Sequence, residues 1–107
     1  MEIEEYLDSD GRSPFGAWFD ALDAKAAARV TVAVARASQG NLSNAKSVGA
    51  GVSELRIDFG PGYRIYFARV GSVLIILLAG GTKKRQQRDI ETAQERWIEY
   101  RQRKRKT

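Results

Sequence analysis

Arg56 and Arg64 are the residues of this sequence whose type and spacing most clearly suggest chemistry. Each lies in a run of alternating polar and apolar residues, and the alternation puts both arginines on one face of two neighbouring predicted strands. A guanidinium group is planar, keeps its charge and matches the oxygen atoms of a phosphate group. Tyr66 and Glu54 fall on the same face and carry groups that can transfer protons. These residue types suit a ligand that contains phosphate, although pairing of the two arginines with Asp58 and Glu54 across the sheet is the favoured interpretation from these residues alone.

Two residue types are missing, and their absence narrows the chemistry. The chain has no cysteine, which excludes disulfides, thiolate nucleophiles and cysteine-ligated zinc. It also has no histidine, the side chain that ordinarily titrates near neutral pH. Any reaction must therefore depend on carboxylates, lysine, arginine, tyrosine, hydroxyl groups or the backbone, and we expect no metal and no other cofactor.

The positive charge of the chain is concentrated at its C-terminal end. The 107 residues carry a formal net charge of +5, while residues 83–107 alone contain ten basic and four acidic side chains. The rest of the chain is therefore close to neutral. Such asymmetry suggests a polyanionic partner, either nucleic acid or an anionic membrane surface, and charge alone does not choose between them.

The sequence shows no targeting segment. Its first residues are acidic, whereas a secretory signal would begin with basic and then apolar residues. The longest apolar run, Val73 to Ala79, is far shorter than the ~20 residues that a transmembrane helix needs. We therefore expect a cytoplasmic protein without membrane contact.

A strand and two helices are predicted in the first half of the chain. Residues 2–7 can form a short strand. Ser13 and Pro14 form a helix start, and apolar residues follow them at helical spacing, namely Phe15, Trp18, Phe19 and Leu22. Asp23 can cap a second helix over about 24–39, which Gly40 and Asn41 end.

Three consecutive strands are predicted next, over residues 52–59, 63–69 and 73–79. Gly60–Gly62 joins the first two as a three-residue hairpin loop, so that Asp58 faces Arg64 and Arg56 faces Tyr66. The third strand is apolar on both faces, which predicts a central strand covered on both sides.

A long helix is predicted at the C-terminal end. Gly80 and Gly81 read as a tight exit from the third strand rather than as a phosphate cradle, and a helix over about 86–103 follows. Its inward side chains are Ile90, Ala93, Trp97 and Tyr100. The order β-α-α-β-β-β-α predicts an α+β fold in a single domain, 1–107, with a frayed basic tail over about 101–107.

Three separated motifs, in order and at the expected spacing, resemble the bacterial RelE/ParE toxin superfamily. The first is the stretch from Gly51 to Phe67, Gly-Val-Ser-Glu-Leu-Arg-Ile-Asp-Phe-Gly-Pro-Gly-Tyr-Arg-Ile-Tyr-Phe. The second is Leu77-Leu78-Ala79-Gly80-Gly81-Thr82-Lys83-Lys84, followed by Gln87-Arg88-Asp89-Ile90 and Ala93. The third is the preceding loop, with Gly40-Asn41, Lys46 and Val48-Gly49. The branch most similar is the phage Gp49-like, HigB-type addiction module killer group, over about residues 15–97.

The resemblance implies a RelE-like fold, a twisted antiparallel sheet flanked by helices. It also implies the toxin of a type II toxin–antitoxin pair, a metal-independent endoribonuclease that cuts mRNA, often at the ribosome. The implied partners are mRNA, the ribosome and a small antitoxin, for this branch usually a helix-turn-helix protein.

The resemblance implies roles for particular residues. RelE-type toxins carry basic residues in equivalent strand and post-strand positions, which implies phosphate binding by Arg56, Arg64, Lys83 and Lys84. Many members place a tyrosine or histidine acid/base near an end of the C-terminal helix, where this chain has Gln86, Gln87, Arg88 and Asp89. Tyr66 and Glu54 remain as proton-transfer candidates, with Asp58 or a lysine as alternatives. The residues expected to attract RNA phosphates are Arg85, Arg88, Arg101, Arg103, Lys104, Arg105 and Lys106.

Other interpretations stay open. Arg56 and Arg64 can instead pair with Asp58 and Glu54 across an exposed sheet face, with no ligand involved. A ParE-like inhibitor of DNA gyrase has the same fold without nuclease activity, and the absence of an obvious acid/base residue favours it. A module that binds RNA or antitoxin but has lost catalytic activity is the third possibility.

Overall fold

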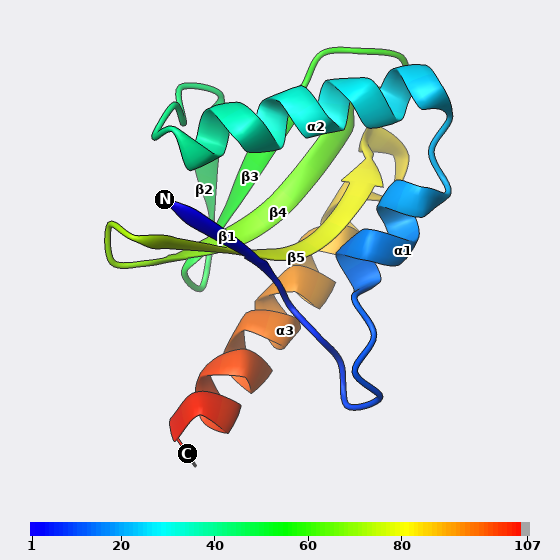
Figure 1. Ribbon diagram of the computed structural model, residues 1–107. Coiled ribbons are helices and arrows are strands. Elements are labelled where there is room, and N and C mark those ends of the chain that lie inside the picture. Colours follow the sequence, from blue (N-terminus) through cyan, green and yellow to red (C-terminus); the bar gives the residue numbers. More distant parts are fainter. Residues whose placement is uncertain (106–107) are drawn as a thin grey trace.

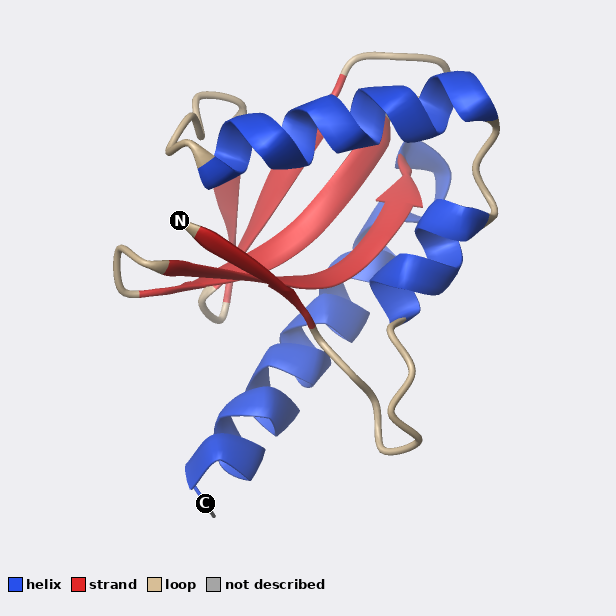
Figure 2. Cartoon of the chain, viewed as in Figure 1, coloured by secondary structure: helices blue, strands red, loops and turns tan. Residues whose placement is uncertain are grey.

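The computed structural model describes residues 1–105, in which helices lie on both sides of one curved sheet (Figures 1 and 2). Along the chain the elements are β1 (Glu2–Glu5), α1 (Pro14–Asp20), α2 (Ala24–Ser38), β2 (Ala45–Gly49), β3 (Val52–Ile57), β4 (Tyr63–Val70), β5 (Leu74–Thr82), the 3₁₀ turn η1 (Lys83–Arg85) and α3 (Gln86–Arg105). The α+β class predicted from the sequence is confirmed. Within residues 1–105, no helix combines the length and hydropathy needed to cross a membrane.

The sheet differs from the prediction in two ways. Within the described residues it has five strands in the order β1-β5-β4-β3-β2, and β1 runs parallel to β5 while the other neighbours are antiparallel. The sheet is therefore mixed. The helices α1 and α2 connect β1 to the four antiparallel strands β2–β5. The predicted loop over 41–51 contains the additional strand β2, whose Lys46 lies opposite Glu54 of β3. Its Gly and Ser content concealed a strand that pairing with β3 stabilises.

The β3–β4 hairpin has a different register from the predicted one. Arg56 lies opposite Arg64 and Ile57 opposite Tyr63, a slip of two residues, so the connecting loop is 58–62. Phe59 leaves the ladder because its N–H bonds back to the carbonyl of Ile57 at 3.0 Å, and its ring stacks on Tyr63 with centroids 6.5 Å apart. Since side chains alternate with period two, the predicted faces are nonetheless correct.

Helix starts follow the predicted caps. The Ser13 hydroxyl accepts from the Gly16 N–H at 2.8 Å, and Asp23 accepts from the Ala26 N–H at 2.8 Å. Gly40, with φ of 89°, follows the end of α2 in the left-handed conformation that glycine favours. These local signals place both helices within a residue or two of the predicted bounds.

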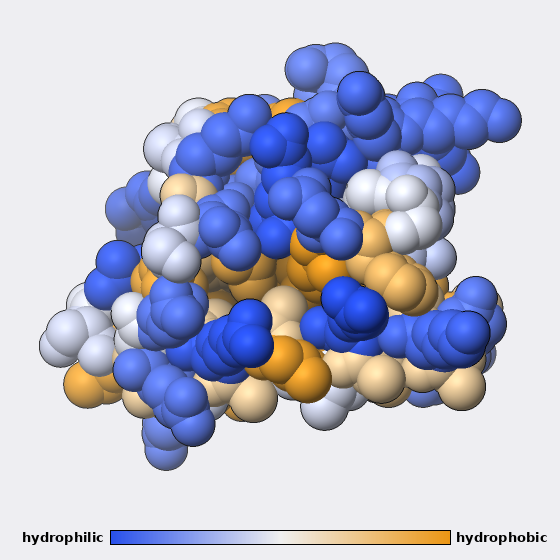
Figure 3. Space-filling view, turned by 90° about the horizontal axis from the view of Figure 1, so that it is seen from above, coloured by the Kyte–Doolittle hydropathy of each residue, from blue (hydrophilic) through white to orange (hydrophobic). Residues whose placement is uncertain are grey.

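Apolar side chains pack on both faces of the sheet. On one face α1 and α2 contribute Phe15, Val30 and Ala37 to a core that includes strand residues Leu55, Ile57, Ile65, Phe67, Ile75 and Leu77. On the other face Ala93 and Trp97 of α3 pack on Val52, Tyr66, Ala68, Ile76 and Leu78, with Ile90 and Tyr100 at the margin. The predicted inward stripe of the C-terminal helix is confirmed, and β5 is an interior strand covered on both sides. Seen from above, the surface is largely hydrophilic around a hollow with a hydrophobic floor (Figure 3).

Gly80 and Gly81 lie inside β5 and do not form the tight strand exit that the sequence suggested. A side chain on Gly80 would overlap the Trp18 ring, and one on Gly81 would overlap the Asp89 carboxyl group. The glycines are therefore needed for close packing from both faces. The absence of a side chain at Gly81 lets the first turn of α3, with Asp89, pack directly against β5.

Candidate functional site

Glu54 is the centre of a polar cluster beneath the start of α3. Its side chain is buried, and Gln86 donates from Nε2 to its Oε2 at 2.8 Å. Arg64 Nε lies 3.6 Å from Oε2, and Lys46 Nζ lies 4.0 Å from Oε1. The carboxylate is thus held between two cations and an amide that come from β4, β2 and α3.

Arg64 is buried and does not offer its guanidinium group freely to a ligand. Its side chain is 6% exposed, and Nη1 donates to the carbonyl of Gly62 at 2.9 Å. The N–H of Lys83 donates to the same carbonyl at 3.2 Å. Arg64 therefore connects the buried carboxylate to the hairpin loop and, through Gly62, to η1.

Tyr66 is also buried, and within the described residues its hydroxyl has no hydrogen-bond partner. Burial raises the pKa of Tyr66 well above its ordinary value, and the neighbouring carboxylate of Glu54 raises it further. The phenol is neutral at physiological pH and sits away from solvent. These properties do not favour the proton-transfer role predicted for Tyr66, and the burial of Glu54 likewise disfavours it as a base.

Arg56 is the accessible arginine of the face. Its side chain is 56% exposed, and Nε lies 3.9 Å from Oδ1 of Asp58, whose side chain is 93% exposed. Both pairings of the alternative interpretation, Arg56 with Asp58 and Arg64 with Glu54, are therefore present. The exposed pair is long and solvated, and such pairs contribute little stability, so it leaves Arg56 available to an anion.

Basic side chains line two surface hollows, one of which includes Glu54. On the β2 side, a hollow of about 270 Å³ is lined by Ser43, Asn44, Ala45, Lys46, Glu54, Arg56 and Asp58. On the α3 side, a hollow of about 280 Å³ is lined by Lys84, Arg85, Gln87 and Arg88. Lys83 is exposed beside this second hollow. Of the predicted phosphate-binding residues, the structure leaves Arg56, Lys83 and Lys84 at the surface and buries Arg64.

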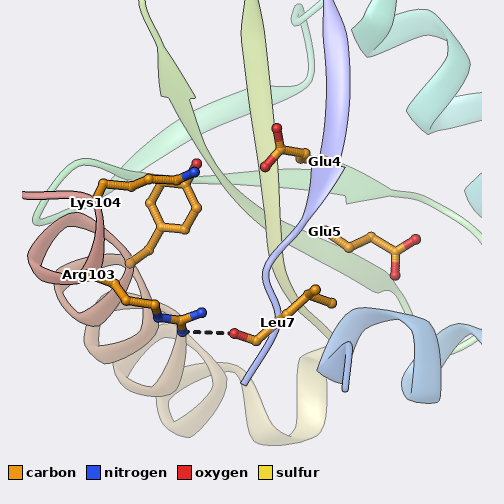
Figure 4. Close-up of a pocket in the computed structure, with 6 residues that line it drawn as sticks. Glu4, Glu5, Leu7, Arg103 and Lys104 are labelled. Carbon is orange, nitrogen blue, oxygen red and sulfur yellow. Dashed lines mark hydrogen bonds between the residues drawn. The ribbon is translucent and has the colours of Figure 1, made fainter. Parts of the chain in front are cut away.

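The distal cations of α3 lie at the other end of the molecule. Arg103 donates from Nη2 to the carbonyl of Leu7 at 2.8 Å and pairs with Glu99, and it lines a groove of about 230 Å³ between β1 and α3 (Figure 4). Arg101 lies over the Trp97 ring and Lys104 over the Tyr100 ring. Arg105 is exposed at the helix end, and Lys106 lies outside the described residues. Their predicted RNA contacts, if made, are distant from the polar cluster.

Sequence reasoning missed several members of the site. Lys46 lies in a segment that was predicted as a loop, although that segment carried one of the three motifs. Gln86 was noted only as standing where relatives of the resembled superfamily carry an acid/base residue, and its hydrogen bond to Glu54 was not predicted. Two further residues of α3 are also partly buried. Burial raises the pKa of Asp89, which packs on Gly81. Burial lowers the pKa of Arg96, whose Nη1 donates to the carbonyl of Leu78 at 2.9 Å.

Comparisons with known proteins place this arrangement in a family. The family described as phage derived protein Gp49-like matches residues 17–98, which includes every member of the polar cluster. An uncharacterized protein of Haemophilus influenzae (strain ATCC 51907 / DSM 11121 / KW20 / Rd) is 42% identical over 80 residues, a stretch that covers 74% of this chain and 81% of that protein.

Proposed function

The chain belongs to the phage-derived Gp49-like family, and from that premise we propose that it is the toxin of a type II toxin–antitoxin module, with a RelE/ParE-like fold, that cleaves mRNA without a metal ion. The single observation that carries the proposal is the set of accessible cations near one buried carboxylate. Lys46 and Arg56 line a hollow together with Glu54, and η1, which directly precedes the Gln86 that bonds to Glu54, carries Lys83 and Lys84. This arrangement suits a phosphodiester group.

Cleavage of RNA through its 2′-hydroxyl group needs charge stabilisation and two proton transfers. The 2′-oxygen loses a proton and attacks the phosphorus, and the leaving 5′-oxygen gains a proton. Arg56 and the lysines supply positive charge where the phosphorane oxygens become more negative. Glu54, buried and held by Arg64 and Gln86, positions Lys46 and the hairpin rather than meeting the substrate. The groups at the surface that can transfer protons are the lysines and Asp58.

Cleavage of a reporter transcript by the purified protein, with and without translating ribosomes, tests this proposal. Arg56→Ala and Lys46→Ala are each expected to lower the cleavage rate about 100-fold, because removal of one charge-stabilising group commonly costs 10²–10³. Arg69→Ala is the matched control, since Arg69 is an exposed arginine of β4 that lines none of the hollows described above. Equal cleavage by wild type and Arg56→Ala would show that the site is assigned wrongly.

A non-enzymatic, ParE-like inhibitor of gyrase is the second candidate. The observation that favours it is the burial of Tyr66, which leaves the site without an accessible tyrosine, while the chain has no histidine. Growth arrest with intact mRNA and inhibited DNA supercoiling would support this alternative. Salt-sensitive RNA binding with neither cleavage nor toxicity would instead support a catalytically inactive binding module.

The proposed toxin acts in the cytoplasm at the ribosome and is neutralised by a small antitoxin of the helix-turn-helix type. A short reading frame for such a protein beside the gene would support this partnership. Co-expression of that neighbour should restore growth to cells that express the chain.

A further inference from the structure

A small polar hollow lies beside the candidate site, where the C-terminal end of α2 approaches β2 and β3 (Figure 1). Its volume is about 90 Å³, smaller than either hollow of the candidate site, so we consider a single phosphate group as its occupant. The lining residues are Ala33, Arg36, Asn41, Ser43, Asn44, Leu55 and Arg56.

The lining of this hollow is positive and rich in donors. Among the described residues that form it, Arg36 and Arg56 carry charge and none is acidic. Arg36 is exposed and makes no ion pair or side-chain hydrogen bond within residues 1–105. Asn41 uses its carbonyl oxygen to accept from the N–H and the hydroxyl of Ser43, at 3.3 and 3.0 Å, which leaves its amide nitrogen as a donor. Donors without a competing carboxylate favour an anion.

The hollow adjoins the candidate site and shares three lining residues with it. Ser43, Asn44 and Arg56 line both this hollow and the larger one that contains Lys46 and Glu54. Arg56 therefore stands between them, and its neighbour Asp58 lines only the larger hollow. Arg56 is thus the residue through which a chain of phosphates would pass from the candidate site to Arg36.

We propose that Arg36, Arg56 and the 41–44 loop bind a phosphate of single-stranded RNA next to the phosphate held at the candidate site. The inference rests on the proposed function only in taking RNA as the ligand, and it requires no cleavage. It extends the RNA path toward α2 and gives a binding role to an arginine outside the basic C-terminal segment.

The test uses a fluorescein-labelled ten-nucleotide RNA whose riboses all carry 2′-O-methyl groups, so that binding is measured without cleavage. Anisotropy titrations at several salt concentrations compare wild type with Arg36→Gln, and Arg69→Gln is the control with the same change of charge. We expect Arg36→Gln to weaken binding several-fold at low salt and to reduce the slope of log K against log salt by about 0.7, the value for one phosphate contact on a single strand. Arg69→Gln should leave both unchanged.

Asn44→Asp provides a second variant, because it places a carboxylate in the hollow without removing an arginine. It should weaken binding at least as much as Arg36→Gln, while thermal unfolding shows that both variants fold. If Arg36→Gln binds like wild type while Arg56→Gln is weakened, the subsite is wrong and the proposed function stands. If Arg36→Gln and Arg69→Gln weaken binding equally, the loss of any one positive charge explains the effect, and the subsite is wrong. If wild type does not bind this RNA at low salt, the subsite is wrong, whereas the proposed function is decided separately by the cleavage assay with translating ribosomes.

Discussion

At the scale of single residues, Glu54 is the group on which the site most depends. A buried carboxylate beside a buried guanidinium is costly to separate, because the remaining charge has neither water nor a partner. The pair is therefore evidence for a defined arrangement of the site rather than for high stability. Removal of Glu54 or Arg64 alone should therefore lower the free energy of unfolding strongly.

We predict that Glu54→Ala lowers the free energy of unfolding by about 3 kcal/mol, because Arg64 is left buried without its counter-charge. Adding Arg64→Met to Glu54→Ala should recover part of that loss, since the double variant contains no isolated buried charge. Guanidinium chloride denaturation measures the stability of the single and the double variant. The control is Glu91→Ala, at an exposed acid of α3, which should change the free energy of unfolding by less than about 0.5 kcal/mol. A loss below about 1 kcal/mol for Glu54→Ala would contradict the burial described here.

Tyr66 gives a prediction with a pH dependence. Its pKa is raised in the folded protein above the ordinary value of 10.0, chiefly by burial. Titration of this phenol therefore leaves the free energy of unfolding unchanged well below pH 10, and lowers it as pH rises from 10 toward the folded-state pKa, because only the unfolded state then releases the proton. We expect Tyr66→Phe to equal wild type or exceed it by up to about 1 kcal/mol at pH 8, since the hydroxyl is buried without a partner.

Urea denaturation at pH 8 and at pH 11 measures this difference. Wild type should lose more stability than Tyr66→Phe between the two values, because only wild type must keep this phenol protonated. Identical losses in the two proteins would mean that the hydroxyl is solvated. If Tyr66→Phe also retained its cleavage activity, a catalytic role for the phenol would be excluded.

At the scale of elements, the packing of α1 and α3 against β5 depends on two glycines. A side chain at Gly80 meets the rigid ring of Trp18, whereas one at Gly81 meets the end of the flexible Asp89 side chain. We predict that Gly80→Ala costs about 3 kcal/mol and Gly81→Ala about 1 kcal/mol, within the range for overpacked cores. Chemical denaturation gives both values, and a reversed order would show that α3 yields less readily than α1.

The elements also show how far the sequence could predict this fold. Ser13, Asp23 and Gly40 give local signals, and a cap or a left-handed residue works the same way in any fold. The hairpin register failed because Phe59 left the ladder to stack on Tyr63, which a pattern of period two does not reveal. The strand β2 was missed although its partner β3 follows after two residues, because its five residues include Gly and Ser and lack the alternation of a strand. The strand over 2–7 was predicted, but its parallel pairing with β5 joins segments about 70 residues apart and has no local signal.

Only part of the site could be predicted, because local patterns show which face a residue is on but not what covers that face. Alternation placed Arg56, Arg64, Glu54 and Tyr66 on one face, and the structure confirms that placement. Alternation does not tell an exposed position from one beneath a helix. Only the position of α3, which Gly81 permits, buries Arg64 and Tyr66 while leaving Arg56 in solvent.

At the scale of the whole molecule, the basic end of the chain is divided between two places. The helix α3 has 20 residues, so its ends are ~30 Å apart. Its first turn adjoins the candidate site, and its last turn contacts the segment after β1 through Arg103 and Leu7. At physiological salt a charge is screened over ~8 Å, so the distal cations do not act on a phosphate bound at the site. Under the proposed function, we therefore expect these cations to act on RNA only through attraction during approach.

The parallel pairing of β1 with β5 has a consequence for the order in which the chain assembles. It joins Glu2 to Leu74 and Glu5 to Leu77, segments that leave the ribosome far apart in time. Contacts between residues so far apart in the sequence form slowly, because the chain between them loses conformational entropy before the contacts stabilise it. During synthesis β1 therefore has no partner until β5 has emerged. We therefore expect β1 to join the sheet only after β5 has been made.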